Sequence, residues 1–136
     1  IDLAGYIERL GSELRAGLAG HGIEVKYDLA RYCVSQEGAI YYGLLVNELI
    51  SNAFKHAFPA SLDRTGSVTV RLAVSDDCIE LSVEDNGIGL PPEFSPDQSS
   101  SLGVHVVAML VEQMDGTVTY ESHPGQGTVV RVQIAD

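Results

Sequence analysis

The spacing of the apolar residues changes along the chain, and the resulting order of helical and extended segments most constrains the fold. Apolar side chains recur every three or four positions over residues 3–20, 36–57 and 102–114, which predicts three amphipathic helices. The predicted apolar face of the third helix holds Val106, Leu110 and Met114. The expected helix boundaries are the N-caps Asp2 and Ser35 and the breakers Gly20-His21-Gly22 and Pro59.

Apolar and polar residues alternate in five other segments, which predicts five half-buried strands. The strands are expected at residues 23–29, 68–74, 79–83, 118–120 and 130–134. Short turns at Asp76-Asp77 and Gly125–Gly127 imply antiparallel pairing, while residues 59–66 and 85–101 are expected to be loops. We therefore expect an α+β fold, a two-layer α/β sandwich with a mixed, mostly antiparallel sheet and the helices on one face.

Composition restricts the classes of partner. The formal net charge of −11 repels phosphate backbones, so nucleic acid is not an expected partner. The same charge repels free nucleotides, so any nucleotide site must supply local countercharge. No apolar run approaches the roughly 20 residues that span a bilayer. Cys33 and Cys78 are expected to be buried thiols in a reducing compartment, with a disulfide as the alternative.

The second predicted helix carries three polar residues on one face. Glu48, Asn52 and Lys55 are spaced i, i+4 and i+7, so their side chains project together. The Asn52 carboxamide oxygen can ligate Mg²⁺, Lys55 can neutralise phosphate charge, and Glu48 can orient or deprotonate a group near a reacting phosphoryl. A solvated helix face with an internal Glu–Lys ion pair explains the same residues, so this segment alone leaves both interpretations open.

The segment Asp85-Asn86-Gly87-Ile88-Gly89-Leu90 directly follows a predicted strand. Its glycines allow the backbone to approach a flat ligand closely. The Asp85 carboxylate can accept a hydrogen bond from the exocyclic amino group of adenine, whereas guanine would present a carbonyl oxygen to it. The segment therefore indicates adenine recognition, although a Gly-rich turn accounts for the same residues.

Two further glycine motifs follow. Ser101-Leu102-Gly103-Val104 lies where the long loop becomes the third helix, and free N–H groups there can cradle phosphate. Gly125-Gln126-Gly127-Thr128 leads into the last strand, where the threonine hydroxyl can bond a purine nitrogen directly or through water. A flexible helix start and a hairpin turn are the alternatives. Four such motifs in this order, each on its expected element, favour a nucleotide site.

Together the motifs resemble those of the Bergerat-type ATP-binding fold, which histidine kinases share with gyrase-like topoisomerases, chaperones and repair proteins. Glu48–Lys55 is similar to the N box of that family, and Asp85–Gly89, Leu102–Val104 and Gly125–Thr128 are similar to its three glycine boxes. The resemblance covers almost the whole chain. The sequence segments NELISNAFKHAF and SLGVHVVAMLVEQMDGTVTYESHPGQGT are most similar to those of sensor histidine kinases with a variant dimerisation domain, grouped near the HWE kinases.

The resemblance implies a role for each motif. Glu48 is the expected catalytic residue, which polarises the acceptor imidazole, and Asn52 is the expected Mg²⁺ ligand. Asp85 is expected to recognise adenine, and residues 90–102 to form a lid over ATP. The expected ATP-binding residues are Asn52, Lys55, His56, Asp85, Gly87, Ile88, Gly89, Leu90, Leu102, Gly103, Val104 and Thr128.

The function implied by the resemblance is to bind Mg²⁺-ATP and donate its γ-phosphoryl group to a histidine on a separate dimerisation domain, in two-component signal transduction. None of His21, His56, His105 and His123 lies in a phosphoacceptor motif. Residues 1–136 are therefore expected to be the ATP-binding catalytic domain alone. The expected partners are ATP, an upstream dimerisation and phosphoacceptor domain, a second copy in a homodimer, and a response regulator receiver domain. The expected location is cytoplasmic, with membrane anchorage of the full protein left open.

Two other functions fit the same fold. An anti-sigma-factor-like serine kinase would phosphorylate a partner serine. The amino-acid sequence of the third helix, which is similar to that of the variant histidine kinases, argues against this function. A non-catalytic scaffold would keep the fold and lose ATP. The joint presence of Glu48, Asn52, Asp85, Gly87 and Gly89 argues against a scaffold, because a degenerate site loses such groups first.

Overall fold

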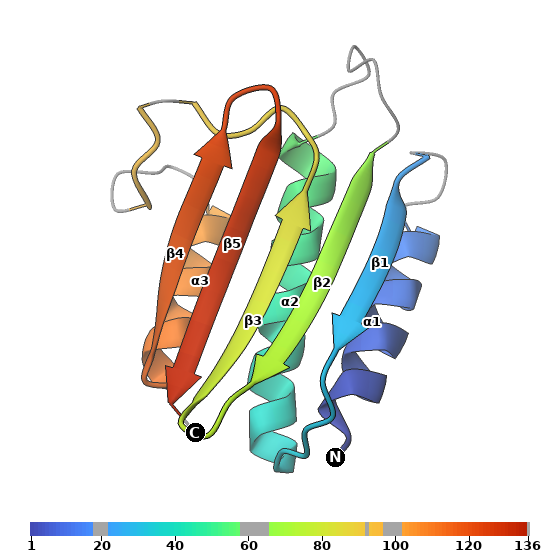
Figure 1. Cartoon of the computed structure of the whole chain (residues 1–136), viewed down its shortest axis with the longest axis vertical. Coiled ribbons are helices and arrows are strands. Elements are labelled where there is room, and N and C mark those ends of the chain that lie inside the picture. The colour runs from blue at the N-terminus through green and yellow to red at the C-terminus, as the bar shows by residue number, and fades with distance from the viewer. Residues whose placement is uncertain (18–21, 58–65, 92, 97–101, 136) are drawn as a thin grey trace.

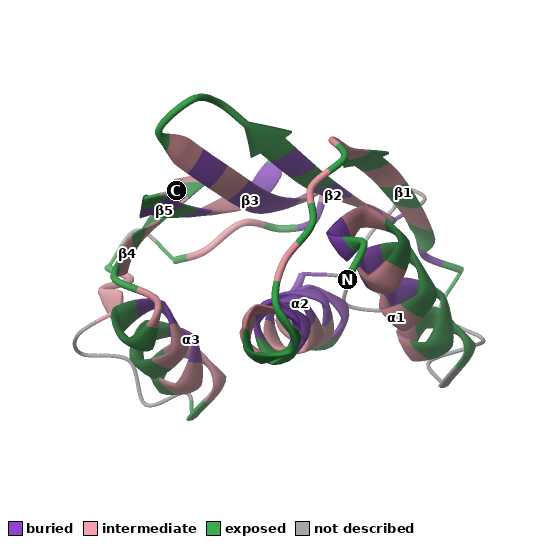
Figure 2. Cartoon of the chain, turned by 90° about the horizontal axis from the view of Figure 1, so that it is seen from below, coloured by how far each residue is buried: buried purple, intermediate pink, exposed green. Residues whose placement is uncertain are grey.

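The chain folds into two layers, as a computed structural model shows for residues 1–17, 22–57, 66–91, 93–96 and 102–135 (Figure 1). One layer is a five-stranded sheet, and the helices of the described part of the chain all cover the same sheet face (Figure 2). The expected α+β two-layer sandwich is therefore confirmed.

The sheet has the spatial order β1-β2-β3-β5-β4. Among the strands of the described residues, only β1 and β2 pair in parallel, and the three other neighbouring pairs are antiparallel, as expected for a mixed, mostly antiparallel sheet. Residues 76–77 form the predicted short turn between β2 and β3. The strands are β1 (Glu24–Leu29), β2 (Ser67–Val74), β3 (Cys78–Asp85), β4 (Gly116–His123) and β5 (Gly127–Ala135).

The helices are α1 (Leu3–Gly17), α2 (Gln36–His56) and α3 (Leu102–Gln113). Ser35 caps α2 as predicted, since its Oγ accepts a hydrogen bond from the Gly38 amide at 3.1 Å. The Asp2 carbonyl accepts the first helical hydrogen bond of α1, from the Tyr6 amide at 3.1 Å.

Three predicted features lie partly or wholly outside the described residues. They are the end of the first helix at Gly20-His21, most of the loop at 59–66, and the last part of the loop at 85–101.

The hydrophobic core lies between the layers, with α2 at its centre (Figure 2). On α3 the fully buried residues are Val107 and Val111, whereas the predicted face of Val106, Leu110 and Met114 is only half-buried. Leu110 and Met114 of the predicted face pack against the core. The sequence analysis did not name the buried residues Val107 and Val111, because the contacts of α3 with α2 and β4 decide which side of the helix is buried. The largest fully buried side chains are Leu3, Ile7, Leu45, Ile50, Leu81, Val46, Val68, Val70, Val107 and Val132.

The opposite face of the sheet bears no helix of the described residues (Figure 2). It carries charged side chains. Ion pairs cross it between neighbouring strands, including Arg71 with Glu84 at 2.8 Å and Arg131 with Glu80 at 3.8 Å. Such exposed pairs contribute little to stability, about 0–1 kcal/mol each. The fold is therefore held mainly by the core beneath the sheet.

The expectation of two buried thiols was wrong. Cys33 is exposed and Cys78 half-buried, and both are free. Cys33 lies in the short segment between β1 and α2, where a bridge to Asp2 holds only its backbone. Cys78 is the first residue of β3, at the end of the sheet. In the described helices we find no segment that combines the length and the hydropathy needed to cross a bilayer.

Candidate functional site

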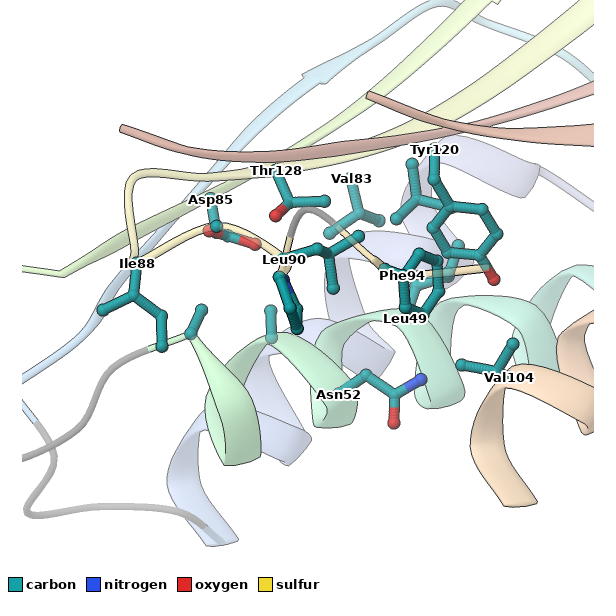
Figure 3. A pocket seen from close by; sticks show the side chains of 15 residues that line it. Leu49, Asn52, Val83, Asp85, Ile88, Leu90, Phe94, Val104, Tyr120 and Thr128 are labelled. Atoms are coloured by element: carbon teal, nitrogen blue, oxygen red, sulfur yellow. The ribbon is translucent and has the colours of Figure 1, made fainter. Parts of the chain in front are cut away.

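A pocket of about 310 Å³ lies between the sheet and α2, at the end of the sheet where β3 finishes (Figure 3). Its walls come from segments that are far apart in sequence: α2, β3 with the residues that follow it, the start of α3, and β4 and β5. The lining residues are Leu49, Asn52, Ala53, Ala57, Val83, Asp85, Ile88, Gly89, Leu90, Pro91, Phe94, Val104, Tyr120, Thr128 and Val130. The pocket is thus mostly apolar, with a few polar side chains from different elements, as is typical of small-molecule sites.

Asp85 is the buried acid of this pocket, with 9% of its surface exposed. Its Oδ1 accepts a hydrogen bond from the Gly87 amide at 2.9 Å, and the Thr128 amide of the paired strand β5 also donates to the carboxylate. Burial raises the pKa of Asp85, and these two backbone hydrogen bonds oppose the rise without cancelling it. A desolvated carboxylate of this kind suits a ligand that donates a hydrogen bond, such as an amino group.

The raised pKa of Asp85 predicts a pH-dependent stability. The folded carboxyl group binds its proton more tightly than the unfolded one, so protonation favours the folded state and this contribution is lost as the pH rises through the raised pKa. We expect the free energy of unfolding of the wild type, relative to Asp85→Asn, to fall as the pH increases from about 4. Urea unfolding of both proteins over a pH series measures this difference, and a difference that rises with pH would contradict the burial argument.

Glycines let three backbone segments touch beside Asp85. A Cβ atom at Gly87 would overlap the Ala57 carbonyl oxygen at the end of α2, which accepts a hydrogen bond from the Ile88 amide at 2.9 Å. A Cβ atom at Gly127, where φ is +124°, would overlap the Asp85 carbonyl oxygen. The first and third glycine motifs therefore hold the floor of the pocket together through direct backbone contact.

The second glycine motif meets the polar face of α2. A Cβ atom added at Gly103 would lie 2.7 Å from Asn52 Oδ1 and 3.1 Å from Glu48 Oε2. The glycine lets the first turn of α3 approach these side chains without displacing their polar ends. The structure thereby brings the expected phosphate cradle against the expected metal ligand.

The oxygen donors of this region suit Mg²⁺. Within the described part of the chain, no cluster of three or more His, Cys, Asp and Glu side chains forms a protein-only metal site. Mg²⁺ binds through one or two protein oxygens and completes its octahedron with water and phosphate oxygens. Asn52 Oδ1 and Glu48 Oε2, which lie around the same position at Gly103, fit that requirement.

The pocket gathers about half of the residues expected to bind nucleotide. Asn52, Asp85, Ile88, Gly89, Leu90, Val104 and Thr128 line it. Other expected site residues do not line it: the expected catalytic residue Glu48 is half-buried on α2, Lys55 is exposed on the last turns of α2, and Leu102 is 77% exposed at the start of α3. Gly87 and Gly103 act through their backbones, and the side chain of His56 lies outside the described part of the structure.

Sequence reasoning missed two aromatic residues of the pocket. The Phe94 and Tyr120 rings meet edge to face, with centroids 5.3 Å apart (Figure 3). The alternating pattern of the β4 segment was a signal for Tyr120, since it placed this residue on the inner face of the strand. Nothing in the sequence indicated that the loop residue Phe94 would pack against it.

Comparison with known proteins decides the family. Residues 39–136 match the family described as histidine kinase-, DNA gyrase B-, and HSP90-like ATPase. The chain belongs to this ATPase family. The match includes all but the first residues of α2, all the glycine motifs and the whole pocket lining, so the resemblance inferred from the four motifs is confirmed.

Within this ATPase family, the matching relatives include sensor histidine kinases. Sensor histidine kinase PdtaS of Mycobacterium tuberculosis is 38% identical over 93 residues, which cover 67% of this chain and 18% of that protein. Blue-light-activated histidine kinase 2 of Erythrobacter litoralis is 33% identical over 139 residues, covering 98% of this chain and 38% of that protein. The solved structure of the Erythrobacter litoralis EL346 blue-light activated histidine kinase has a TM-score of 0.89 at 31% identity, over 98% of this chain and 42% of that chain. The chain thus spans less than half the length of each of these relatives.

Proposed function

We propose that this ATPase domain, residues 1–136, binds Mg²⁺-ATP and donates the γ-phosphoryl group to a histidine of a separate dimerisation domain. The observation that carries the proposal is the buried Asp85 carboxylate, which faces the same pocket as Asn52 and Thr128. A buried acceptor for an amino group, with oxygen donors for a metal nearby, matches the two ends of an adenine nucleotide. The sensor histidine kinases among the relatives support a histidine as the acceptor.

The proposed roles follow from the positions of the side chains. Asp85 and Thr128 bind the adenine edge, while Ile88 and Leu90 contact the flat faces of the base. Gly87 and Gly89 allow the backbone to approach the base closely. These groups account for the base end of the nucleotide.

The phosphate end lies between α2 and the start of α3. Asn52 ligates Mg²⁺, and Lys55 and His56 contribute positive charge to the phosphates. The amides of Leu102, Gly103 and Val104 at the start of α3 contribute hydrogen bonds to them. Bound Mg²⁺ supplies neutralisation and orientation of phosphate oxygens. Glu48, beside Gly103, polarises the acceptor imidazole.

The proposed partners belong to the full-length protein. They are an upstream dimerisation and phosphoacceptor domain, a second copy of the protein in a homodimer, and a response regulator receiver domain that takes the phosphoryl group onto an aspartate. The proposed location is the cytoplasm.

Calorimetric titration with ATP and GTP, with and without Mg²⁺, tests the nucleotide part of this proposal. We expect Mg²⁺ to strengthen ATP binding, and GTP to bind at least about 100-fold more weakly because its carbonyl oxygen faces the Asp85 carboxylate. No heat of binding with millimolar ATP would overturn the proposal.

Labelling from [γ-³²P]ATP in the presence of the dimerisation domain tests the acceptor, because phosphohistidine is acid-labile and phosphoserine is acid-stable.

Replacement of Asn52 by Ala is expected to remove the Mg²⁺-dependent part of the ATP affinity and leave the Mg²⁺-free part unchanged. The reason is that the carboxamide oxygen acts on the nucleotide through the metal. Calorimetry at several Mg²⁺ concentrations measures this, with Asn47→Ala as the control, because Asn47 lies on the same helix but does not line the pocket. An Asn52→Ala protein that keeps the Mg²⁺ response would contradict the assignment.

A further inference from the structure

The loop that leaves the pocket is attached to β4 at two points. We define the loop root as Leu90, Pro91, Glu93 and Phe94, which are described residues of the long loop between β3 and α3. At the first point, the Leu90 amide donates a hydrogen bond to Ser122 Oγ at 2.6 Å. At the second point, the Phe94 ring packs edge to face on the Tyr120 ring. The loop root is therefore held at both of its ends.

Both attachment points lie on the same face of β4. Tyr120 and Ser122 are two positions apart in β4, so their side chains lie on the same face of the sheet. Both are half-buried on that face, while Thr119 and Glu121 between and beside them are exposed on the other. Within the loop root, the Phe94 amide donates a hydrogen bond to the Pro91 carbonyl oxygen at 3.0 Å, which holds these two residues close together.

The loop root forms a wall of the pocket. Leu90, Pro91 and Phe94 line it, and so does Tyr120 (Figure 3). The wall faces the same cavity as Asp85 and Thr128, the pair proposed to bind the adenine edge. Displacement of the loop root would therefore change the shape of the cavity that receives the base.

Ser122 also connects the loop root to Thr128. Its Oγ lies 3.4 Å from Thr128 Oγ1 and 3.4 Å from the Gly127 carbonyl oxygen. Because the oxygen accepts the Leu90 amide hydrogen, the single hydroxyl hydrogen can be directed to one of these oxygens. The hydroxyl group of Ser122 thus joins the end of the first glycine motif to the third.

We propose that Tyr120 and Ser122 are positioning residues that act as one anchor, holding the loop root as the wall of the nucleobase end of the pocket. This inference rests on the proposed function. Neither side chain is assigned to the phosphates, so the anchor acts on every ligand that carries the adenine base. A purely structural role would instead lower the stability of the hairpin of β4 and β5 and leave the affinity of the folded protein unchanged.

The test is calorimetric titration of the chain with ATP, ADP and adenosine. Ser122→Ala removes the acceptor of the Leu90 amide, and Tyr120→Leu removes the ring contact; each is expected to weaken binding by between about twofold and tenfold. The factor should be the same for the three ligands, because they share the base and differ in phosphates. Tyr120→Phe keeps the ring contact with Phe94 and should lose less affinity than Tyr120→Leu does.

Two further proteins sharpen the test. Thr119→Ala, on the exposed face of the same strand, is the matched control and should leave all three affinities unchanged. In the double variant of Ser122→Ala and Tyr120→Leu, the loss should be smaller than the product of the single losses, because the first change already releases the loop root. Circular dichroism and thermal melts identify a single variant that fails to fold, in which case the other single variant carries the test.

The outcomes separate the two proposals. Wild-type affinity in folded Ser122→Ala overturns the anchor, and so does a loss of affinity that is confined to ATP and ADP. The anchor is also overturned if the affinity loss of the double variant equals the product of the two single losses. Each of these results leaves the proposed function intact. Failure of the wild type to bind ATP overturns the proposed function, and the anchor with it.

Discussion

Replacement of Asp85 by Asn is expected to weaken ATP binding by at least about 100-fold, or roughly 3 kcal/mol. The carboxylate accepts hydrogen bonds from the amides of Gly87 and Thr128 and, in the proposed complex, from the adenine amino group. An asparagine side chain offers one acceptor oxygen and one NH₂ group in the same place. Its NH₂ group must then face the hydrogen of another donor, which leaves a buried polar group unpaired.

The measurement is calorimetry on folded Asp85→Asn, with ATP and with adenosine. Both ligands should lose affinity alike, because the proposed contact is to the base. Glu84→Gln removes the same charge one residue earlier, on the polar outer face where Glu84 pairs with Arg71, and should bind ATP as the wild type does. Unchanged ATP affinity in Asp85→Asn would remove adenine from this end of the pocket. Equal losses in both variants would indicate a general effect of charge.

Replacement of Gly127 by Ala is expected to destabilise the fold by about 3 kcal/mol or more. The residue has a φ of +124°, which side chains rarely tolerate, and its Cβ atom would overlap the Asp85 carbonyl oxygen. Relief of the overlap requires β5 to move away from the end of β3, where Asp85 pairs with Thr128. The same movement opens the floor of the pocket, so ATP affinity should fall together with stability.

Urea unfolding monitored by circular dichroism measures the change in stability. Gly125→Ala is the matched control: this residue lies in the same turn with a φ of +78°, but among the described residues other than its chain neighbours none has an atom within 4 Å of the Cβ position. It should cost only about 1–2 kcal/mol, from the left-handed backbone alone. Equal costs at the two positions would mean that the overlap with Asp85 relaxes freely.

The sequence predicted most of the fold because its local signals agree with one another. The second helix was expected at residues 36–57 and is found at Gln36–His56, since Ser35 supplies a cap and the apolar spacing is continuous. The face of α3 was predicted less well. Its fully buried line is set by how the helix lies against α2 and β4, and that contact has no local signal in the sequence.

The candidate site was also predicted in part: its motif residues were identified from the sequence, but the contacts between distant segments were not. Asp85, Asn52 and Thr128 were predicted because their residue types stand in recognisable motifs, and the structure places all three around one pocket. Contacts between distant segments could not be predicted. The hydrogen bond from Leu90 to Ser122 and the packing of Phe94 on Tyr120 join positions about 30 residues apart, and each becomes visible only when β4 lies beside the loop root.

The outer face of the sheet, which no helix of the described residues covers, has a consequence for the evolution of the sequence. That face bears surface ion pairs such as Arg71 with Glu84, whereas the helices cover the other side (Figure 2) and the pocket lies beneath it, between the sheet and α2. Because such exposed ion pairs contribute little to stability, we expect substitutions among relatives to concentrate on the outward positions of this face. The same face is the natural place to immobilise the protein or attach a reporter dye, because a tether at Arg71 approaches the pocket no closer than the thickness of the sheet.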